Sequence, residues 1–252
     1  MVGQKMMPNR DKDVLVLIPA FNEEASIGSV ITDVLSNNYQ LLVISDGSSD
    51  NTVEVARSFG VPVLQFYSNL GVGAALRAGF RYADTEGFRY VVQVDADGQH
   101  DASQIVNLVS AAEQGNFHLV IGSRFRSNET SMTVSPIRRL AMWTLATLAS
   151  RAANTKITDA SSGFRCISQP LLGEFAQNFP SSYLGDTYEA LISAGLGGYR
   201  ITEVAASMAP RQAGTSSASQ IRAFGLTVRA ALVGLLRFHV RINPYVESTS
   251  SK

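Results

Sequence analysis

The sequence predicts an α/β protein built on a mostly parallel sheet that is flanked by helices. Short apolar runs alternate with stretches whose apolar residues recur at helical spacing. The connections between them are short, and polar, glycine-containing segments follow several of the runs. This alternation favours right-handed crossovers between parallel strands. A chain of 252 residues is long enough to bury the core of one such domain.

The first half of the chain carries the clearest alternation. Residues 14–18 form a continuous apolar run that stops at Pro19, which is typical of a buried central strand. In the helix expected next, apolar residues at positions 27, 30, 31, 34 and 35 share one face. The remaining elements expected in this half are strand 41–44, helix 51–59, strand 63–66, helix 72–83, strand 91–94, helix 105–112 and strand 119–121.

The second half is less regular. It predicts helix 136–153, a strand beginning near residue 165, a helix near 186–194, strand 201–205 and a last helix near 219–238. In that last helix Arg222, Arg229 and Arg237 fall in one angular sector, and most other positions are apolar. Such a helix fits a membrane interface, or equally a helix packed on the core with a solvated arginine edge. Helix 136–153, with Trp143, is a second interface candidate.

The organisation expected is a flexible tail over residues 1–12, one domain over 13–215, an amphipathic helix over 216–240 and a flexible tail over 241–252. The charge is balanced, with 21 Lys plus Arg and 21 Asp plus Glu. The chain therefore has no net positive charge that would attract nucleic acid. The one cysteine, Cys166, fits a reducing compartment and inert burial in a strand. No signal peptide and no membrane-spanning run is visible. We therefore expect a cytoplasmic protein whose membrane contact is peripheral.

Two carboxylates follow the apolar strand 91–94. Asp95 and Asp97 are two residues apart, and in an extended chain alternate side chains point to the same side. A pair of carboxylates suits Mg²⁺ or Mn²⁺, which completes its octahedron with phosphate oxygens and water. On its own the pair favours a polar loop whose carboxylates are solvated or cap a helix.

Two other polar loops follow apolar strands, at residues 19–23 and 45–48. The carboxyl ends of parallel strands meet at one edge of a sheet, where ligands bind. The three loops are therefore expected to converge, which favours a binding site over solvated loops.

Several rival sites are disfavoured. The segment Gly71-Val72-Gly73 is followed by Leu76 where a dinucleotide fingerprint needs glycine or alanine. A phosphate-binding P-loop and a serine nucleophile elbow are missing from the sequence, and three scattered histidines do not form a zinc site. His100 is expected to be an exposed loop histidine.

The motifs resemble those of inverting family-2 glycosyltransferases with the GT-A fold, and among them the dolichyl- or polyprenyl-phosphate sugar synthases. The matching segments occur in family order over about residues 14–211: 18–24, 45–52, 69–71, 94–100, 122–125 and 159–165. The resemblance implies a mixed, mostly parallel sheet flanked by helices, with the amphipathic helix at its C-terminal end. One departure is Ser45 before Asp46, where many members have a second aspartate.

The resemblance also implies roles for individual residues. Those expected to bind the nucleotide are Pro19, Ala20, Phe21, Asn22, Glu23, Asp46, Gly47, Ser48, Asn69 and Gly71. Those expected to hold Mg²⁺ or Mn²⁺ are Asp95, Asp97 and Gln99. Those expected to bind phosphate are Arg124, Arg138 and Arg211. Those expected to be catalytic are Asp95, Asp97, Asp159 and Arg165.

The function implied is transfer of a sugar from a GDP- or UDP-sugar to a polyprenyl phosphate at the cytoplasmic face of the membrane. A small membrane subunit is a further expected partner. One alternative is a family-2 transferase acting on a sugar hydroxyl of a glycan or soluble acceptor, since Asp186 and Glu189 lie where such relatives place a base. Another is a non-catalytic nucleotide-sugar-binding module.

Overall fold

The computed structural model describes residues 13–125, 136–180, 186–209 and 242–245, and of residues 136–142 and 186 only the backbone. The elements are β1 (Val14–Ala20), α2 (Ile27–Ser36), β2 (Gln40–Ser45), α3 (Thr52–Ser58), β3 (Val63–Gln65), α4 (Val72–Thr85), β4 (Tyr90–Gln93), η1 (Ala102–Gln104), α5 (Ile105–Gly115), β5 (Leu119–Ser123), α6 (Pro136–Ala153), β6 (Arg165–Ser168), α7 (Leu171–Asn178), α8 (Asp186–Leu196) and β7 (Ile201–Ala205).

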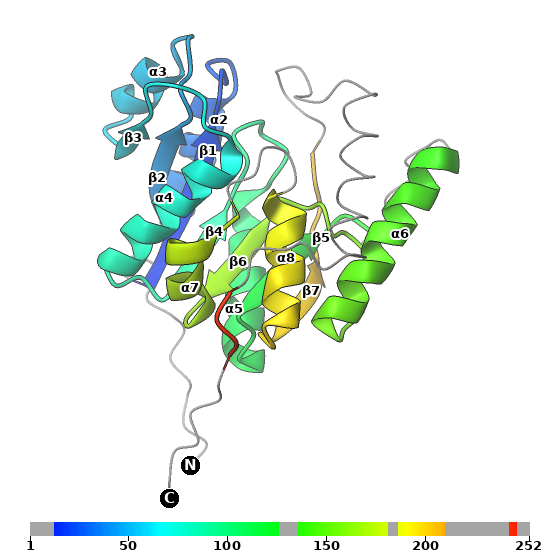
Figure 1. Ribbon diagram of the computed structural model, residues 1–252. Coiled ribbons are helices and arrows are strands. Elements are labelled where there is room, and N and C mark those ends of the chain that lie inside the picture. The colour runs from blue at the N-terminus through cyan, green and yellow to red at the C-terminus, as the bar shows by residue number, and fades with distance from the viewer. Residues whose placement is uncertain (1–12, 126–135, 181–185, 210–241, 246–252) are drawn as a thin grey trace, which may run out of the picture.

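The strands form one sheet in the order β3-β2-β1-β4-β6-β5-β7. All neighbours are parallel except β6, which runs antiparallel to both β4 and β5. The helices form two layers, with α4, α7, α8 and α6 on one face of the sheet and α2, α3 and α5 on the other (Figure 1). The expected mixed, mostly parallel sheet flanked by helices is confirmed.

Both faces of the central strands are buried, which explains their continuous apolar runs. In β1, Leu15 and Leu17 pack in the core below α4 and α7. The alternate residues Val14, Val16 and Ile18 pack in the second core, below α2 and α5. One strand therefore serves two hydrophobic cores.

The topology brings loops from distant parts of the sequence to one edge of the sheet. The parallel strands β1, β2, β4 and β5 all end at this carboxyl edge, at Ala20, Ser45, Gln93 and Ser123. The antiparallel strand β6 begins there instead, and it starts at Arg165. Residues 159–164 therefore lie at the same edge as the loops that follow the parallel strands.

Three details differ from the expectations. Strand β4 ends at Gln93, and residues 96–98 form a turn in which Gly98 has φ +75°, so the alternation of an extended strand does not orient Asp97. Helix α7 was not expected from the sequence. His100 is buried rather than exposed.

Cys166 is fully buried in β6, as expected, and burial raises the pKa of its thiol. The last amphipathic helix, both tails and the boundary at residue 215 lie outside the described residues, apart from residues 242–245 of the C-terminal tail. Within the described residues, no helix is both long and apolar enough to span a bilayer.

Candidate active site

The first two loops of the carboxyl edge are joined by hydrogen bonds between side chains and backbone. Asn22 has φ +57°, and its side-chain oxygen accepts from the backbone N–H of Ser49 at 2.8 Å. The backbone N–H of Asn22 donates to the hydroxyl of Ser48 at 3.1 Å, and that of Glu23 donates to the hydroxyl of Thr52 at 2.8 Å. The two loops therefore form one continuous surface, and the polar atoms of Asn22 and Ser48 help to build it.

The expected nucleotide residues of the β1 end differ in exposure. Ala20 is buried as the last residue of β1, and Pro19 before it is half-buried. Phe21 is exposed, so its ring is open to a ligand at this edge. The carboxylate of Glu23 accepts from the hydroxyl of Ser26 at 2.9 Å.

Asp46 fixes the third loop against the second. Its buried carboxylate accepts from the backbone N–H groups of Leu70 at 2.8 Å and Gly71 at 2.9 Å. A carboxylate is favoured here because α4 begins at Val72, and helix N-termini attract negative charge. Gly47 has φ +70°, and a Cβ there would lie 2.4 Å from the carbonyl carbon of Ser68. Asp46 and Gly47 therefore hold the loop that carries Asn69.

Asp95 lies two residues beyond β4, and its side chain is 39% exposed. The side-chain amide of Gln93 donates to its Oδ1 at 3.2 Å. On the other side it meets Gly163, where a Cβ would lie 2.5 Å from Oδ2 and 2.6 Å from Oδ1. The carboxylate is thus confined by its neighbours but remains open to solvent.

The side chain of His100 also contacts Asp95. The backbone N–H of Asp95 donates to Nδ1 of His100 at 3.1 Å, and Nε2 lies 3.9 Å from Oδ2 of Asp95. The ring stacks on Phe164, with centroids 5.0 Å apart and planes at 20°. The expectation of a solvated histidine was wrong because the turn after β4 folds the ring back over β6.

Asp97 is buried, and its Oδ1 accepts from the backbone N–H of Gln99 at 3.0 Å. The side-chain amide of Gln99 reaches the carbonyl oxygen of Ala209 at 3.4 Å, and the backbone N–H of Ala209 donates to the carbonyl oxygen of Gln99 at 2.9 Å. The chain after β7 therefore returns to the loop that carries the two aspartates.

Asp95 and Asp97 carry the oxygen ligands that a hard divalent cation prefers. Next to the Asp95 carboxylate, residue 163 has to be a glycine, because a Cβ there would collide with the carboxylate oxygens. Among the described residues, no three His, Cys, Asp or Glu side chains form a metal cluster. A cation such as Mg²⁺ or Mn²⁺ is commonly held by one or two carboxylates together with phosphate oxygens and water.

Arg124 and Asp159 form a bidentate ion pair across the edge. Nε of Arg124 donates to Oδ2 of Asp159 at 2.8 Å, and Nη2 donates to Oδ1 at 2.9 Å. The carboxylate is fully buried, whereas the side chain of Arg124 is 28% exposed. The hydrogen bond to Asp159 raises the pKa of Arg124, with Coulombic attraction from Asp159 and Asp95 adding to the effect. The guanidinium is therefore fixed in place and always charged.

A second carboxylate, Glu203 of β7, anchors this arrangement and was not identified from the sequence. It is buried and accepts from the backbone N–H groups of Thr158 at 3.0 Å and Asp159 at 2.7 Å. It also accepts from the hydroxyl of Thr158 at 2.8 Å. The signal that was available is a single acid in a short strand whose other residues are uncharged.

Arg165 is buried, and its guanidinium donates to three backbone carbonyls. Nε reaches Ser162 at 2.7 Å, Nη1 reaches Thr187 at 2.6 Å and Nη2 reaches Ala160 at 2.8 Å. Burial lowers its pKa to about 10, which leaves it charged at neutral pH. Its contacts tie the loop before β6 to the start of α8.

Two of the expected phosphate ligands are not placed. Arg138 belongs to α6, but only its backbone is described. Arg211 falls within residues 210–241, outside the described residues. Ala209, two residues before it, is the residue hydrogen-bonded to Gln99.

Comparisons with known proteins agree with this architecture. Residues 15–175 match the glycosyl transferase family 2 model. The polyprenol monophosphomannose synthase of Mycolicibacterium smegmatis is 28% identical over 241 residues, covering 90% of this chain and 87% of the relative. The UDP-N-acetylglucosamine–dolichyl-phosphate N-acetylglucosaminyltransferase of Methanococcus voltae is 26% identical over 212 residues, covering 77% of this chain and 84% of the relative.

A solved structure shares the fold. The glucosyl-3-phosphoglycerate synthase of Mycobacterium tuberculosis, crystallised with Mn²⁺, UDP and phosphoglyceric acid, superposes with a TM-score of 0.64 at 24% identity. The match covers 90% of this chain and 78% of that structure.

Proposed function

Because the chain belongs to glycosyl transferase family 2, we propose that it transfers a sugar from a nucleotide-sugar donor to a polyprenyl phosphate, with Mg²⁺ or Mn²⁺ bound at Asp95, Asp97 and Gln99. The acceptor class is supported by relatives named for dolichyl phosphate and polyprenol. We further propose that the reaction takes place at the cytoplasmic face of a membrane.

The observation that carries the proposal is the position of residues 159–165. This short segment touches the candidate metal carboxylate through Gly163, which abuts Asp95. It also orients Arg124, the candidate ligand of the acceptor phosphate, because the guanidinium of Arg124 donates two hydrogen bonds to Asp159. We propose that this segment holds the diphosphate side and the acceptor side of the site at a fixed spacing.

The proposed reaction is a single displacement at the anomeric carbon. An oxygen of the acceptor phosphate forms the new bond while the bond to the donor diphosphate breaks, and the nucleoside diphosphate leaves with the bonding electrons. A bound divalent cation supplies neutralisation of the charge that develops on the diphosphate. The transition state has oxocarbenium character, as in glycoside hydrolysis.

Arg124 is proposed to bind the acceptor phosphate, because guanidinium groups match phosphate oxygens well. Asp159 acts through Arg124 by fixing its orientation. A phosphate monoester with a second pKa of about 6 is largely ionised at neutral pH, so this acceptor needs no strong general base. Arg165, bound to three carbonyls, is proposed to be a positioning residue rather than one that touches the reacting atoms.

The loops after β1 and β2 are proposed to hold the nucleotide. Phe21 offers an exposed ring, and Asp46 and Gly47 set the loop that carries Asn69. The donor is proposed to carry uridine or guanosine.

The test is transfer of radiolabel from UDP- and GDP-sugars to short polyprenyl phosphates, with Mg²⁺ and with Mn²⁺. The proposal expects label in the organic phase that disappears when EDTA is added. If label moves only into a soluble phosphorylated acceptor such as phosphoglyceric acid, the acceptor is not a lipid phosphate and the alternative of a soluble acceptor holds. No transfer or hydrolysis of any donor would leave the non-catalytic alternative.

A further inference from the structure

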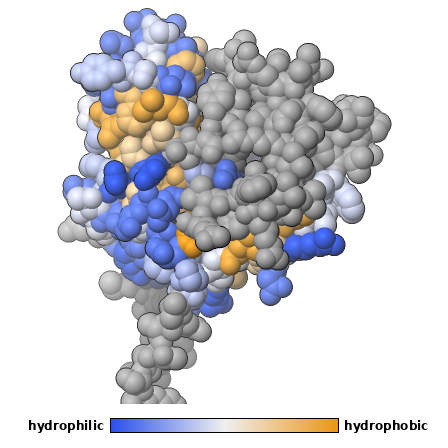
Figure 2. Space-filling model, in the orientation of Figure 1, coloured by the Kyte–Doolittle hydropathy of each residue, from blue (hydrophilic) through white to orange (hydrophobic). Residues whose placement is uncertain are grey.

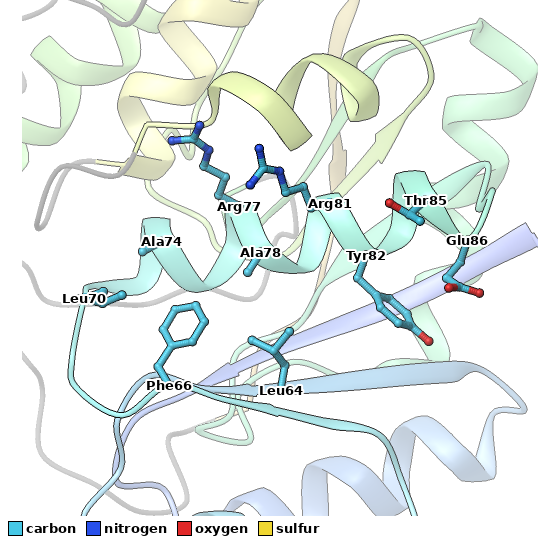
Figure 3. Close-up of a pocket in the computed structure, with 10 residues that line it drawn as sticks. All are labelled: Leu64, Phe66, Leu70, Ala74, Arg77, Ala78, Arg81, Tyr82, Thr85 and Glu86. Carbon is cyan, nitrogen blue, oxygen red and sulfur yellow. The ribbon is translucent and has the colours of Figure 1, made fainter.

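A shallow groove runs along the exposed side of α4, and its lining does not include Asp95 or Asp97. Its volume is about 780 Å³, within the ~300–1,000 Å³ typical of small-molecule sites. Ala74 and Ala78 form its floor, and Leu64 and Phe66 from β3 and the residue after it form an apolar wall (Figure 3). Figure 2 shows an orange area at the upper left of the molecule with hydrophilic residues below it. We call the groove lined by these α4 and β3 residues the α4 groove.

Two arginines form the opposite wall of the α4 groove. Arg77 and Arg81 lie one helical turn apart and project to the same side of α4 (Figure 3). Like charges at this spacing repel, which disfavours the helix. Among the described residues, neither arginine forms an ion pair. Glu86, the acidic residue of the groove lining, lies beyond Arg81 towards the far end of α4 (Figure 3), so the described lining keeps an excess of positive charge. An anionic ligand would neutralise it.

The mouth of the α4 groove lies at the carboxyl edge of the sheet. Strand β3 is parallel to β2 and ends at Gln65, beside Ser45, so the loop after it emerges where the candidate active site opens. Tyr67, Leu70 and Val72 of this region are exposed. Phe21 after β1 and Phe125 after β5 are exposed at the same edge. Exposed apolar side chains therefore lie along this edge of the sheet.

We propose that the α4 groove docks on an anionic lipid bilayer, with Arg77 and Arg81 on lipid phosphates and the apolar wall and loop 66–71 against the acyl chains. Charge complementarity supports this occupant, since guanidinium pairs with phosphate and arginine beside apolar side chains is typical of membrane-surface segments. The orientation rests on the proposed function, because a lipid-borne phosphate reaches the site only if the bilayer meets the carboxyl edge.

The test is flotation of the full chain with phosphatidylcholine vesicles that contain or lack phosphatidylglycerol, without acceptor or donor. Each basic residue near an anionic surface contributes about 1 kcal/mol, or roughly fivefold. The double variant Arg77→Gln/Arg81→Gln should therefore bind phosphatidylglycerol vesicles about 30-fold more weakly than the unchanged chain. Leu70→Ser should weaken binding to a smaller extent, and added salt should affect the double variant less.

A matched control is the double variant Arg89→Gln/Arg200→Gln. It removes the same charge, but these arginines precede β4 and β7 at the opposite edge of the sheet, so binding should stay near that of the unchanged chain. Equal loss in both double variants would overturn the proposal, as would binding that does not depend on phosphatidylglycerol. Self-association that the Arg77→Gln/Arg81→Gln variant abolishes, without any vesicle binding, would assign the groove to a second copy instead.

The result is independent of catalysis. Sugar transfer to a short acceptor in detergent tests the proposed function, whereas vesicle binding tests the docking surface. Arg77→Gln/Arg81→Gln should leave transfer in detergent unchanged and slow transfer to acceptor embedded in vesicles.

Discussion

The carboxylate of Asp95 lies against the backbone of Gly163, so closely that a Cβ on residue 163 would come within 2.5 Å of Oδ2. Gln93 and His100 confine the same residue from other sides. A carboxylate held in this way is oriented before a cation arrives, and such preorganisation lowers the cost of binding.

Gly163→Ala should therefore displace the Asp95 carboxylate and weaken Mn²⁺ binding in the presence of nucleoside diphosphate. Changes to groups that orient metal ligands typically cost about 10–100-fold in affinity or activity. Electron paramagnetic resonance of free Mn²⁺ during titration measures the effect directly. Gly173→Ala in α7 is the control, because its Cβ would meet only side-chain atoms at 3.3 Å and beyond. Unchanged Mn²⁺ affinity in a folded Gly163→Ala variant would contradict this role.

Asp159→Asn should destabilise the fold and loosen Arg124. The amide keeps the size of the carboxylate but removes the charge that accepts two hydrogen bonds from the guanidinium. Hydrogen bonds to charged groups contribute roughly 1.5–3 kcal/mol to stability. Urea unfolding should therefore show a decrease of that order in the free energy of unfolding. The KM for the acceptor should rise more than the KM for the donor.

The control for Asp159 is Ser161→Ala, which removes a hydroxyl that makes longer contacts of 3.2 Å to Asp159 and 3.3 Å to Arg124. Its effect on unfolding should stay below about 1 kcal/mol. An acceptor KM that is unaffected by Asp159→Asn would show that the ion pair is structural only.

His118 should make stability depend on pH. Burial, with a smaller contribution from the charge of Arg200, lowers its pKa. The unfolded chain binds a proton near pH ~6.5, whereas the folded chain binds it only at lower pH. The free energy of unfolding should therefore fall as the pH drops below about 6.5 and level off below the folded pKa.

Urea unfolding at about pH 8 and about pH 5 measures this dependence. His118→Gln should flatten it, while the amide oxygen can still accept the backbone N–H of Arg200 that Nδ1 now accepts. Asp101, whose pKa is lowered by hydrogen bonds from Ser103, loses its contribution only near its ordinary value of about 3.9 or below. A variant with the full pH dependence of the unchanged chain would remove His118 as its cause.

Much of the fold could be predicted from the sequence because central parallel strands are buried on both faces. The runs that became β1 and β2 are continuous and end at polar loops, so the carboxyl edge could be located before the structure was known. Helix α7 could not, since its eight residues, Leu171–Asn178, follow Pro170 with too few turns to show a clear period.

The sequence indicated which residues lie at the carboxyl edge better than it indicated what each of them contacts. Asp46 and Asp95 were expected at the edge, and the structure places them there. Their partners depend on which loops meet in space. The pairing of Arg124 with Asp159, the anchoring by Glu203 and the burial of His100 all join segments that are far apart along the chain or folded back by a turn. Periodicity does not encode such contacts.

The most direct test of the central claim, that Asp95 and Asp97 bind the donor diphosphate through a divalent cation, is calorimetric titration of UDP and GDP with and without Mn²⁺. The unchanged chain should bind one of these nucleotides far more tightly with Mn²⁺ than without it, and Asp97→Asn should lose that difference while melting at a similar temperature. Nucleotide binding that is equally tight without the cation, or equally cation-dependent in Asp97→Asn, would contradict the account.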